Sequence, residues 1–287
     1  MSALEIIDPG PQALIQDAGR PGWASIGVGR CGAADRSAYE LGARLVAHDP
    51  GMASLEVTFG GLVARVHGSM TVVLTGADAH ASLDGRPVAH DSLLDLHDGQ
   101  ELRLGMPSAG LRTYLTARGG WDVPAVLGSR SFDTLSGLGP APLEAGDLLT
   151  LVDYEGSYPN VDVAPVPLPS NELMHLSILP GPRRDWFATT DALTDQVWSV
   201  SDRSNRIGIR LDGEPLTRTQ DKADAELPSE GMVRGALQVP PDGQPVVFGN
   251  DHPVTGGYPV IAVVTSADMD RAAQLRPGQQ VRFRWAR

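Results

Sequence analysis

Short strand-like runs separated by turn residues are the feature that most constrains this 287-residue chain. Between residues 54 and 117 they follow one another closely, with Gly-Gly, Asp-Gly or His-Gly between them. We find no helices in this stretch of the kind that connects parallel strands. The spacing predicts antiparallel strands folded into a sandwich or a barrel. We therefore expect a mainly β protein with a few short helices.

The composition indicates a turn-rich globular protein with more than one domain. The 33 glycines and 23 prolines are spread along the whole chain, and 41% of the residues are apolar, enough to bury a core. Residues 153–170 are rich in Pro, Tyr, Asp and Val and have no periodicity, as in a linker. We expect a β-rich domain over 1–155, a linker over 156–171 and a β-barrel domain over 172–287.

Charge and residue usage exclude several classes of function. The formal charge of −12 argues against a nucleic-acid or anionic-membrane partner, because binding to either depends on clustered Lys and Arg. Lys222 is the only lysine, so the chain has no Gly-Lys-Ser/Thr phosphate loop. Cys31 is the only cysteine, and no apolar run approaches the roughly 20 residues that span a bilayer. We expect a cytoplasmic protein that does not enter the membrane.

Familiar catalytic and metal-binding patterns are also missing. The seven histidines form no His-x-His, His-x-x-His or His-Glu-x-x-His, so we expect no metal site. Gly-x-Ser-x-Gly is absent, and Cys31 has no basic neighbour beyond Arg30, which favours a structural role for the thiol. Gly27 to Gly32 matches Gly-x-Gly-x-x-Gly, but no apolar strand leads into it, so a dinucleotide site is not indicated.

The segment from Gly235 to Pro259 is the strongest candidate for a site. Two short strands joined by Pro-Pro-Asp-Gly predict a hairpin. After it come Asn250, Asp251, Thr255 and Tyr258, grouped around the pair Gly256-Gly257. A double glycine lets the backbone approach a ligand closely, and polar side chains offer that ligand hydrogen bonds. The alternative is a tight loop whose polar side chains cap their own backbone.

Arginines in polar turns form a second group of candidates. Arg130 lies in Gly-Ser-Arg-Ser, and both Arg203 and Arg206 lie in Ser-Asp-Arg-Ser-Asn-Arg. A guanidinium donates two parallel hydrogen bonds, which suits a carboxylate, a phosphate or a urea-like ligand. The alternative is that a neighbouring Asp pairs with each arginine to hold its loop.

Six motifs in order resemble the biotin-dependent carboxyltransferase-like family. The resemblance covers nearly the whole chain. The motifs are Asp8-Pro-Gly with Gln16-Asp-x-Gly-Arg20, Gly119-Gly-x-x-Val-Pro-x-x-Leu-Gly-Ser-Arg-Ser131, Pro180-Gly-Pro-Arg-x-Asp-Trp-Phe187, Ser204-Asn-Arg-x-Gly-x-Arg-Leu211, Gly235-Ala-x-Gln-Val-Pro-Pro-Asp-Gly-Gln-Pro245 and Thr255-Gly-Gly-Tyr-Pro259. The family includes allophanate hydrolase subunit 2, the C-type subunit of 5-oxoprolinase, an antikinase subunit and the second half of the urea carboxylase carboxyltransferase region.

The resemblance implies two β-rich domains with cyclophilin-like barrel character. It also implies a partner like allophanate hydrolase subunit 1 or the B-type subunit of 5-oxoprolinase, a small amide, lactam or ureide substrate, and ATP used by the assembled complex. No lysine-bearing biotin-attachment signature is present, so we expect no biotin attached to this chain. Many relatives have Asp-Arg-Gln-Thr before Thr-Gly-Gly-Tyr-Pro, and Asp251-His-Pro-Val in its place is closer to the urea carboxylase type.

We predict a subunit of an ATP-dependent, amide-processing hydrolase whose active site is shared with that partner. Asp251, Tyr258 and Gln238 are predicted to hydrogen-bond the amide as catalytic residues. The predicted substrate-binding residues are Arg130, Arg203, Arg206, Asn250, Thr255, Gly256 and Gly257. Two alternatives stay open: a regulatory, antikinase-like subunit without chemistry of its own, and a urea carboxylase-type carboxyltransferase half.

Overall fold

The chain forms two compact units. We describe a computed structural model that covers residues 2–48, 51–153, 156–157, 159 and 161–286, so residues 158 and 160 of the predicted linker lie outside the described part. The first unit consists of Met1–Arg20, Cys31–Asp133 and Gly137–Ser170. The second consists of Pro21–Arg30, Thr134–Ser136 and Asn171–Arg287. Two short segments from the first half of the chain thus fold with the second unit.

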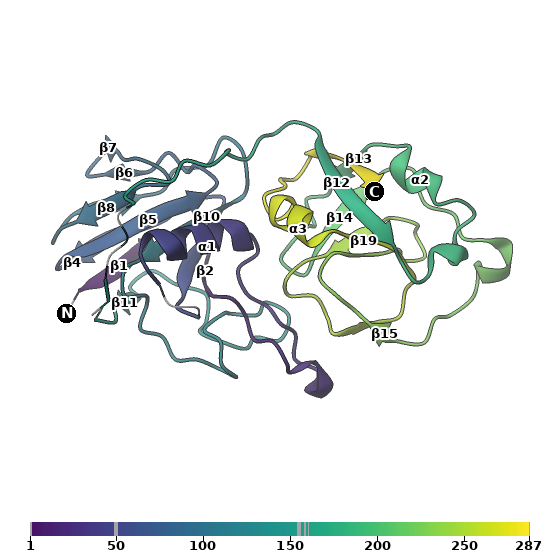
Figure 1. Cartoon of the computed structure of the whole chain (residues 1–287), viewed down its shortest axis with the longest axis horizontal. Coiled ribbons are helices and arrows are strands. Elements are labelled where there is room, and N and C mark those ends of the chain that lie inside the picture. Colours follow the sequence, from purple (N-terminus) through teal and green to yellow (C-terminus); the bar gives the residue numbers. More distant parts are fainter. Residues whose placement is uncertain (1, 49–50, 154–155, 158, 160, 287) are drawn as a thin grey trace. The chain divides into compact units, whose positions relative to one another are not determined.

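The first unit contains two antiparallel sheets (Figure 1). In order across the sheet, the six-stranded sheet contains β11 (Leu148–Thr150), β1 (Ala3–Asp8), β4 (Val63–His67), β9 (Glu101–Arg103), β6 (Ser82–Leu83) and β7 (Arg86–Pro87). The five-stranded sheet contains β2 (Gln12–Gln16), β3 (Ser54–Thr58), β10 (Arg112–Ala117), β5 (Met70–Gly76) and β8 (Leu93–Leu96). Alternate residues of both sheets form one apolar core, to which β1 contributes Leu4 and Ile6 and β3 contributes Leu55 and Val57.

One helix, α1 (Arg36–Leu45), packs against β5 and β10 of the five-stranded sheet (Figure 1). Its first turn is capped by Asp35, whose side chain accepts a hydrogen bond from the Ala38 amide at 3.0 Å. Gly42 faces the sheet, where a Cβ would lie 2.7 Å from Thr116 Oγ1, so only glycine lets the helix come this close. This ten-residue helix is one of the few short helices that the sequence predicts.

The second unit is built on a closed seven-stranded barrel. Its strands are β12 (Met174–Pro180), β19 (Val260–Val264), β16 (Ala236–Gln238), β17 (Val246–Phe248), β14 (Gly208–Asp212), β13 (Trp198–Val200) and β20 (Gln280–Trp285). Among the described strands of the barrel, β12 and β20 are the only neighbouring pair that runs parallel. Strand β12 alternates buried Met174, Leu176 and Ile178 with half-buried residues, so one face fills the barrel. Closure leaves the barrel without a free edge.

Short elements surround the barrel. They are α2 (Asp191–Thr194), α3 (Ser266–Ala272), the 3-10 turns η1 (Ala24–Ile26), η2 (Arg184–Trp186) and η3 (Gln220–Lys222), and the two-stranded ribbon of β15 (Glu230–Gly231) and β18 (Thr255–Gly256). The ribbon bears on the predicted site, because β18 contains the start of the Thr-Gly-Gly-Tyr-Pro motif. It joins that motif to a segment about 25 residues earlier in the chain, through Glu230 opposite Gly256.

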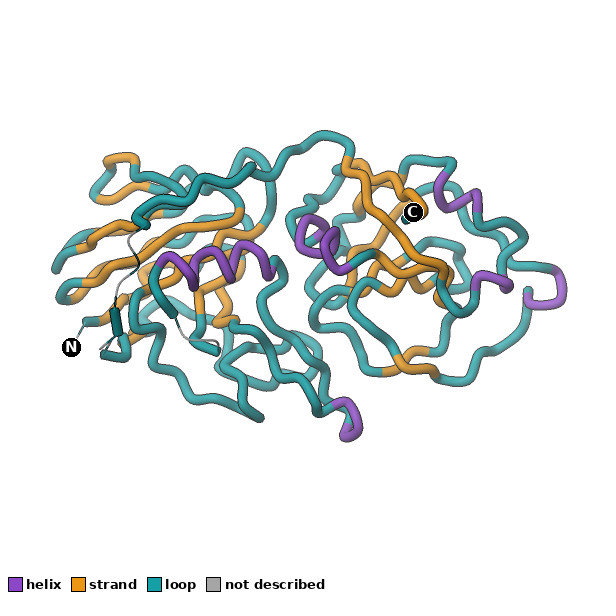
Figure 2. Tube along the Cα trace, in the orientation of Figure 1, coloured by secondary structure: helices purple, strands orange, loops and turns teal. Residues whose placement is uncertain are grey.

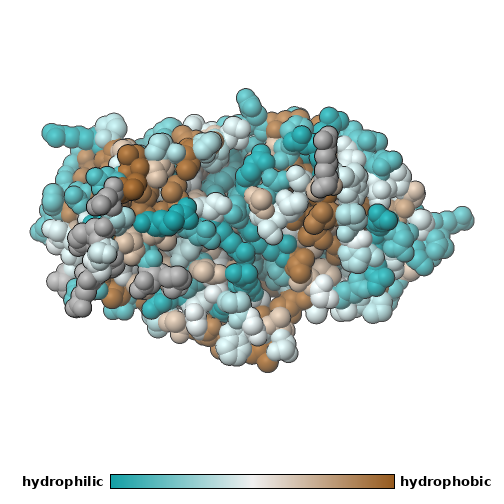
Figure 3. All heavy atoms as spheres, viewed as in Figure 1, coloured by the Kyte–Doolittle hydropathy of each residue, from teal (hydrophilic) through white to brown (hydrophobic). Residues whose placement is uncertain are grey.

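The structure confirms the mainly β prediction. Strands and loops dominate the trace, and helices are few and short (Figure 2). The predicted hairpin is also confirmed, since β16 pairs antiparallel with β17 and Gly243 in its turn has φ +77°. None of the described helices is both long and apolar enough to cross a bilayer. The face drawn in Figure 3 is mostly hydrophilic, with apolar residues in small separate groups.

Candidate functional site

A pocket of about 370 Å³ in the second unit contains part of the predicted site. This volume lies within the ~300–1,000 Å³ typical of small-molecule sites. The lining residues are Trp186, Arg218, Ala223, Asp224, Ala225, Glu226, Leu227, Pro241, Gly257, Tyr258 and Pro259. The last three belong to the Thr-Gly-Gly-Tyr-Pro motif, and Tyr258 is 45% exposed although it is a large aromatic residue. The motif therefore presents its glycine and tyrosine to an open cavity.

The ribbon of β15 and β18 fixes the position of the motif beside this pocket. Glu230 pairs with Gly256 in the ribbon, and its carboxylate forms an ion pair with Arg183, whose Nε lies 3.0 Å from Oε1. Hydrogen bonds from Arg183 hold the pKa of the Glu230 carboxyl below its ordinary value. Hydrogen bonds from two nitrogens of one guanidinium to one carboxylate are directional as well as ionic. The Arg183–Glu230 pair therefore helps to align β15 against β18.

Gln238 lies directly behind the double glycine. The pairing of β16 with β19 shifts register between Leu237 and Gln238, and such bulges redirect the side chain beside them. The buried Gln238 amide donates from Nε2 to the Tyr258 carbonyl at 3.2 Å. A Cβ on Gly256 would lie 2.6 Å from the same Nε2. Gly256 thus leaves room for the Gln238 amide, which acts on the backbone of the motif.

A buried ion pair anchors the segment that leads to the motif. The Arg206 guanidinium donates from Nε to Asp251 Oδ2 at 2.9 Å and from Nη2 to Oδ1 at 3.0 Å. Thr134 adds two bonds to Oδ2, from its amide at 3.0 Å and from its hydroxyl at 2.7 Å. Both charged side chains are almost fully buried, with 1% and 0% exposure. These hydrogen bonds engage both oxygens of the Asp251 carboxylate. The direct effect of Asp251 is therefore on the conformation of the surrounding chain.

The environment of Asp251 keeps the carboxylate ionised. Burial alone raises the pKa, but the Arg206 charge and the hydrogen bonds from Arg206 and Thr134 outweigh it. The pKa of Asp251 is therefore below its ordinary value. An ionised, fully hydrogen-bonded carboxylate inside the unit is a rigid anchor, provided that its cationic partner is present.

The other predicted residues lie in different surroundings. Asn250 accepts a 2.7 Å hydrogen bond from Arg234 Nε at Oδ1, and Thr255 is exposed in β18. Arg203 is 67% exposed and lies 3.5 Å from Asp212, outside the residues that line the pocket. Arg130 belongs to the first unit, where its guanidinium donates to the carbonyls of Val123 and Gly51.

Trp186 and Arg218 are among the nine lining residues that were not predicted as site residues. Trp186 is the Trp of the motif ending at Phe187, so the sequence contained a signal for it. Arg218 lies in none of the six motifs. Its position follows from backbone pairing, because Phe187 and Arg218 form a β-bridge and the Thr219 amide donates to the Trp186 carbonyl at 2.9 Å.

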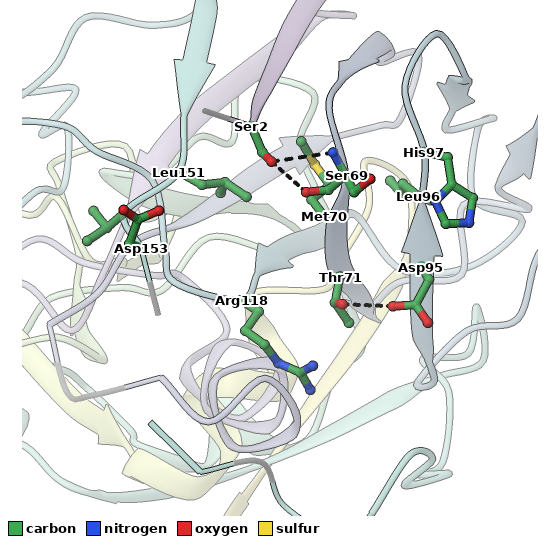
Figure 4. A pocket seen from close by; sticks show the side chains of 11 residues that line it. Ser2, Ser69, Met70, Thr71, Asp95, Leu96, His97, Arg118, Leu151 and Asp153 are labelled. Carbon is green, nitrogen blue, oxygen red and sulfur yellow. Dashed lines mark hydrogen bonds between the residues drawn. The ribbon is translucent and has the colours of Figure 1, made fainter. Parts of the chain in front are cut away.

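A second pocket, of about 400 Å³, lies in the first unit (Figure 4). None of the predicted site residues lines it. Thr71 donates to Asp95 at 2.7 Å, and Ser2 donates to the Ser69 carbonyl at 2.6 Å, so these polar groups bond to one another across the pocket wall. The pocket of the second unit is the better candidate, because it contains the motif.

Comparison with known proteins identifies the family. The model of the carboxyltransferase domain, subdomain A and B, matches residues 26–285, which is most of the chain. The chain belongs to this carboxyltransferase family. The resemblance inferred from the six motifs is thereby confirmed.

Three relatives show the extent of the similarity. The C-type subunit of 5-oxoprolinase from Escherichia coli is 38% identical over 285 residues, which cover 98% of this chain and 90% of the relative. The crystal structure of TTHA0988 matches 99% of this chain with a TM-score of 0.89 and 32% identity, and the chain spans 55% of that protein. The urea amidolyase of K. lactis matches 99% of this chain with a TM-score of 0.92 and 27% identity, over 19% of its own length.

Loss of the Asp251 charge should destabilise the second unit. Asp251→Asn leaves the buried Arg206 charge without its counter-ion, and breaking a buried pair this way costs about 3–5 kcal/mol. In wild type the pair stabilises the fold above the ordinary pKa of 3.8, and this contribution is lost as the pH falls through the lower pKa of the folded state. Urea unfolding at pH 7 and between about pH 5 and 2 measures both effects.

The double variant Arg206→Met with Asp251→Leu is the matched control. Its loss of unfolding free energy should be at least about 1 kcal/mol smaller than the summed losses of Arg206→Met and Asp251→Leu alone. Each of these single changes leaves the other charge buried without its partner. Strictly additive losses would show that the two charges do not depend on each other.

Gly256 and Gly257 should differ in their tolerance of alanine. Gly256→Ala places a methyl group against the Gln238 amide and should break its bond to Tyr258, at a cost of about 1 kcal/mol. At Gly257 the nearest atom to a Cβ is the Leu227 carbonyl oxygen at 3.5 Å, an ordinary contact. Thermal unfolding of both variants checks this. Equal loss in both would contradict the assigned role of Gln238.

Proposed function

We propose that this chain is the C-type subunit of an ATP-dependent 5-oxoprolinase, and that its substrate pocket is the cavity beside the Thr-Gly-Gly-Tyr-Pro motif. The observation that carries the proposal is the 38% identity to the E. coli subunit, which extends over nearly the whole of both chains. The pocket supports it, since its size suits a small molecule and Gly257 and Tyr258 line its wall.

The reaction sets a clear requirement for such a pocket. A lactam is a poor electrophile, so the enzyme has to hold its ring while the carbonyl group is made more reactive by phosphorylation or carboxylation. The backbone groups of Gly257 and the hydroxyl of Tyr258 are suited to hydrogen-bond the N-H and carbonyl of an amide. We assign substrate contact to these two residues.

Gln238, Asp251 and Arg206 are proposed to act as positioning residues. Gln238 holds the Tyr258 carbonyl, and the Arg206–Asp251 pair holds the segment before the motif. None of these three side chains is among those that line the pocket. Their effect on turnover would therefore pass through the geometry of Gly257 and Tyr258.

The chain has no Gly-Lys-Ser/Thr phosphate loop for ATP, and its only lysine, Lys222, is paired with Asp221 at 3.2 Å. We therefore assign to this chain the binding and orientation of the lactam, and to the complex with a partner such as the B-type subunit of 5-oxoprolinase the use of ATP.

A second candidate function is the carboxyltransferase half of a urea carboxylase. The fold similarity to the K. lactis urea amidolyase, with a TM-score of 0.92, favours it. Asp251-His-Pro-Val in place of the more usual residues before the motif also points this way. The two candidates differ in substrate, a lactam or urea, and share the pocket.

Turnover by the assembled complex distinguishes these candidates. With its subunit partners, the wild-type chain should support ATP hydrolysis that depends on 5-oxoproline and not on urea or allophanate. Tyr258→Ala should lower this rate about tenfold or more, because a substrate contact is lost. Arg210→Ala, at an exposed position outside the pocket, is the control and should leave the rate unchanged.

Hydrolysis driven by urea in place of 5-oxoproline would favour the carboxyltransferase half. Tight association with the partner, without ATP hydrolysis in the presence of any small amide, would favour a regulatory subunit. Either result would overturn the proposed 5-oxoprolinase function.

A further inference from the structure

Arg218 lines the pocket, and its charge has no ionic partner among the described residues. Its side chain is half buried, and its guanidinium carbon lies 5.7 Å from the centre of the Trp186 ring. Nη1 donates a long 3.4 Å hydrogen bond to the Ala225 carbonyl. Nε is buried and has no hydrogen-bond partner in the part of the chain that the structure describes. The side chain is only half buried and makes one long hydrogen bond, so the terminal nitrogens of its guanidinium keep donors for a ligand in the pocket.

The backbone fixes this guanidinium in place. The β-bridge between Phe187 and Arg218 is flanked by hydrogen bonds from the Ala188 amide to the Thr217 carbonyl at 3.0 Å and from the Thr219 amide to the Trp186 carbonyl at 2.9 Å. The stacking contact with Trp186 then restricts the side chain itself. A group restricted in this way loses little entropy when it binds a ligand.

Among the charged residues around the pocket, Arg218 is the cation that lines its wall. Lys222 also lies over the Trp186 ring, at 5.9 Å, but it is paired with Asp221. Asp224 and Glu226 line the pocket too, and both residues are exposed. An anion that enters would therefore meet a half-buried guanidinium at the wall and exposed carboxylates at the surface.

We infer that Arg218 binds a carboxylate on the substrate and is the residue that selects an anionic lactam over a neutral amide. A guanidinium can donate two parallel hydrogen bonds to a carboxylate from its two terminal nitrogens. The ring carboxylate of 5-oxoproline meets this requirement, whereas urea has no such group. The inference rests on the proposed function for its substrate, and on Arg218 for its selectivity.

Binding to the full-length chain and to its complex tests the inference. The probes are 5-oxoproline and pyrrolidinone, which is the same lactam ring without the carboxylate. By calorimetry, wild type should bind 5-oxoproline more tightly than pyrrolidinone. Arg218→Gln should reduce this preference about 10- to 100-fold, the effect of losing a charge-assisted hydrogen bond, with little change for pyrrolidinone. Arg210→Gln, at an exposed position of the same unit, should keep it.

Arg218→Lys separates recognition from folding. It keeps the positive charge over Trp186 but not the fork, so it should restore part of the preference and should unfold at the same temperature as wild type. The inference is overturned if Arg218→Gln keeps the full preference, or if wild type binds both lactams equally. Failure of the complex to hydrolyse ATP with 5-oxoproline, while Arg218 still determines the binding preference, would overturn the proposed function and leave the selectivity of Arg218 standing.

Discussion

The second unit depends on one buried ion pair. Arg206 and Asp251 meet through two hydrogen bonds at almost zero exposure, and Thr134 completes the shell of the carboxylate. Without these bonds the charges would cost several kcal/mol each inside the unit. With them, the chain after β17 has one favoured position, and it leads directly into the glycine pair of the motif. The Arg206–Asp251 ion pair therefore fixes the conformation of this loop.

The pocket beside that loop combines a fixed backbone with a stacked cation. Gln238 and the close approach at Gly256 fix the backbone, while pairing between the segments around Trp186 and Arg218 brings in the cation. Each of these devices is positioned by strands of the barrel or by bridges next to them. A small lactam would meet backbone groups and Tyr258 in one part of the pocket and a guanidinium in another, which matches a ring that carries both an amide and a carboxylate.

The sequence predicted the fold better than the site. Short strands, turn pairs and the hairpin between β16 and β17 are local signals, and they were read correctly. The polar residues of the Gly235–Pro259 segment were predicted from one local stretch, but their surroundings depend on contacts between distant residues. Asp251 is anchored by Arg206 and by Thr134, 117 positions earlier. Arg218 was missed because only its bridge to Phe187, at a distant place in the chain, brings it to the pocket. No local pattern encodes such a pairing.

The central claim is that the cavity next to the double glycine receives the substrate. Backbone amide shifts of the full chain, recorded by NMR while 5-oxoproline is added, test it most directly. The account predicts saturable shifts of the Gly257 and Tyr258 amides and of the Trp186 indole N-H, with the resonances of β1 and β4 unchanged. Saturable shifts confined to the pocket of the first unit, near Thr71 and Asp95, would contradict it.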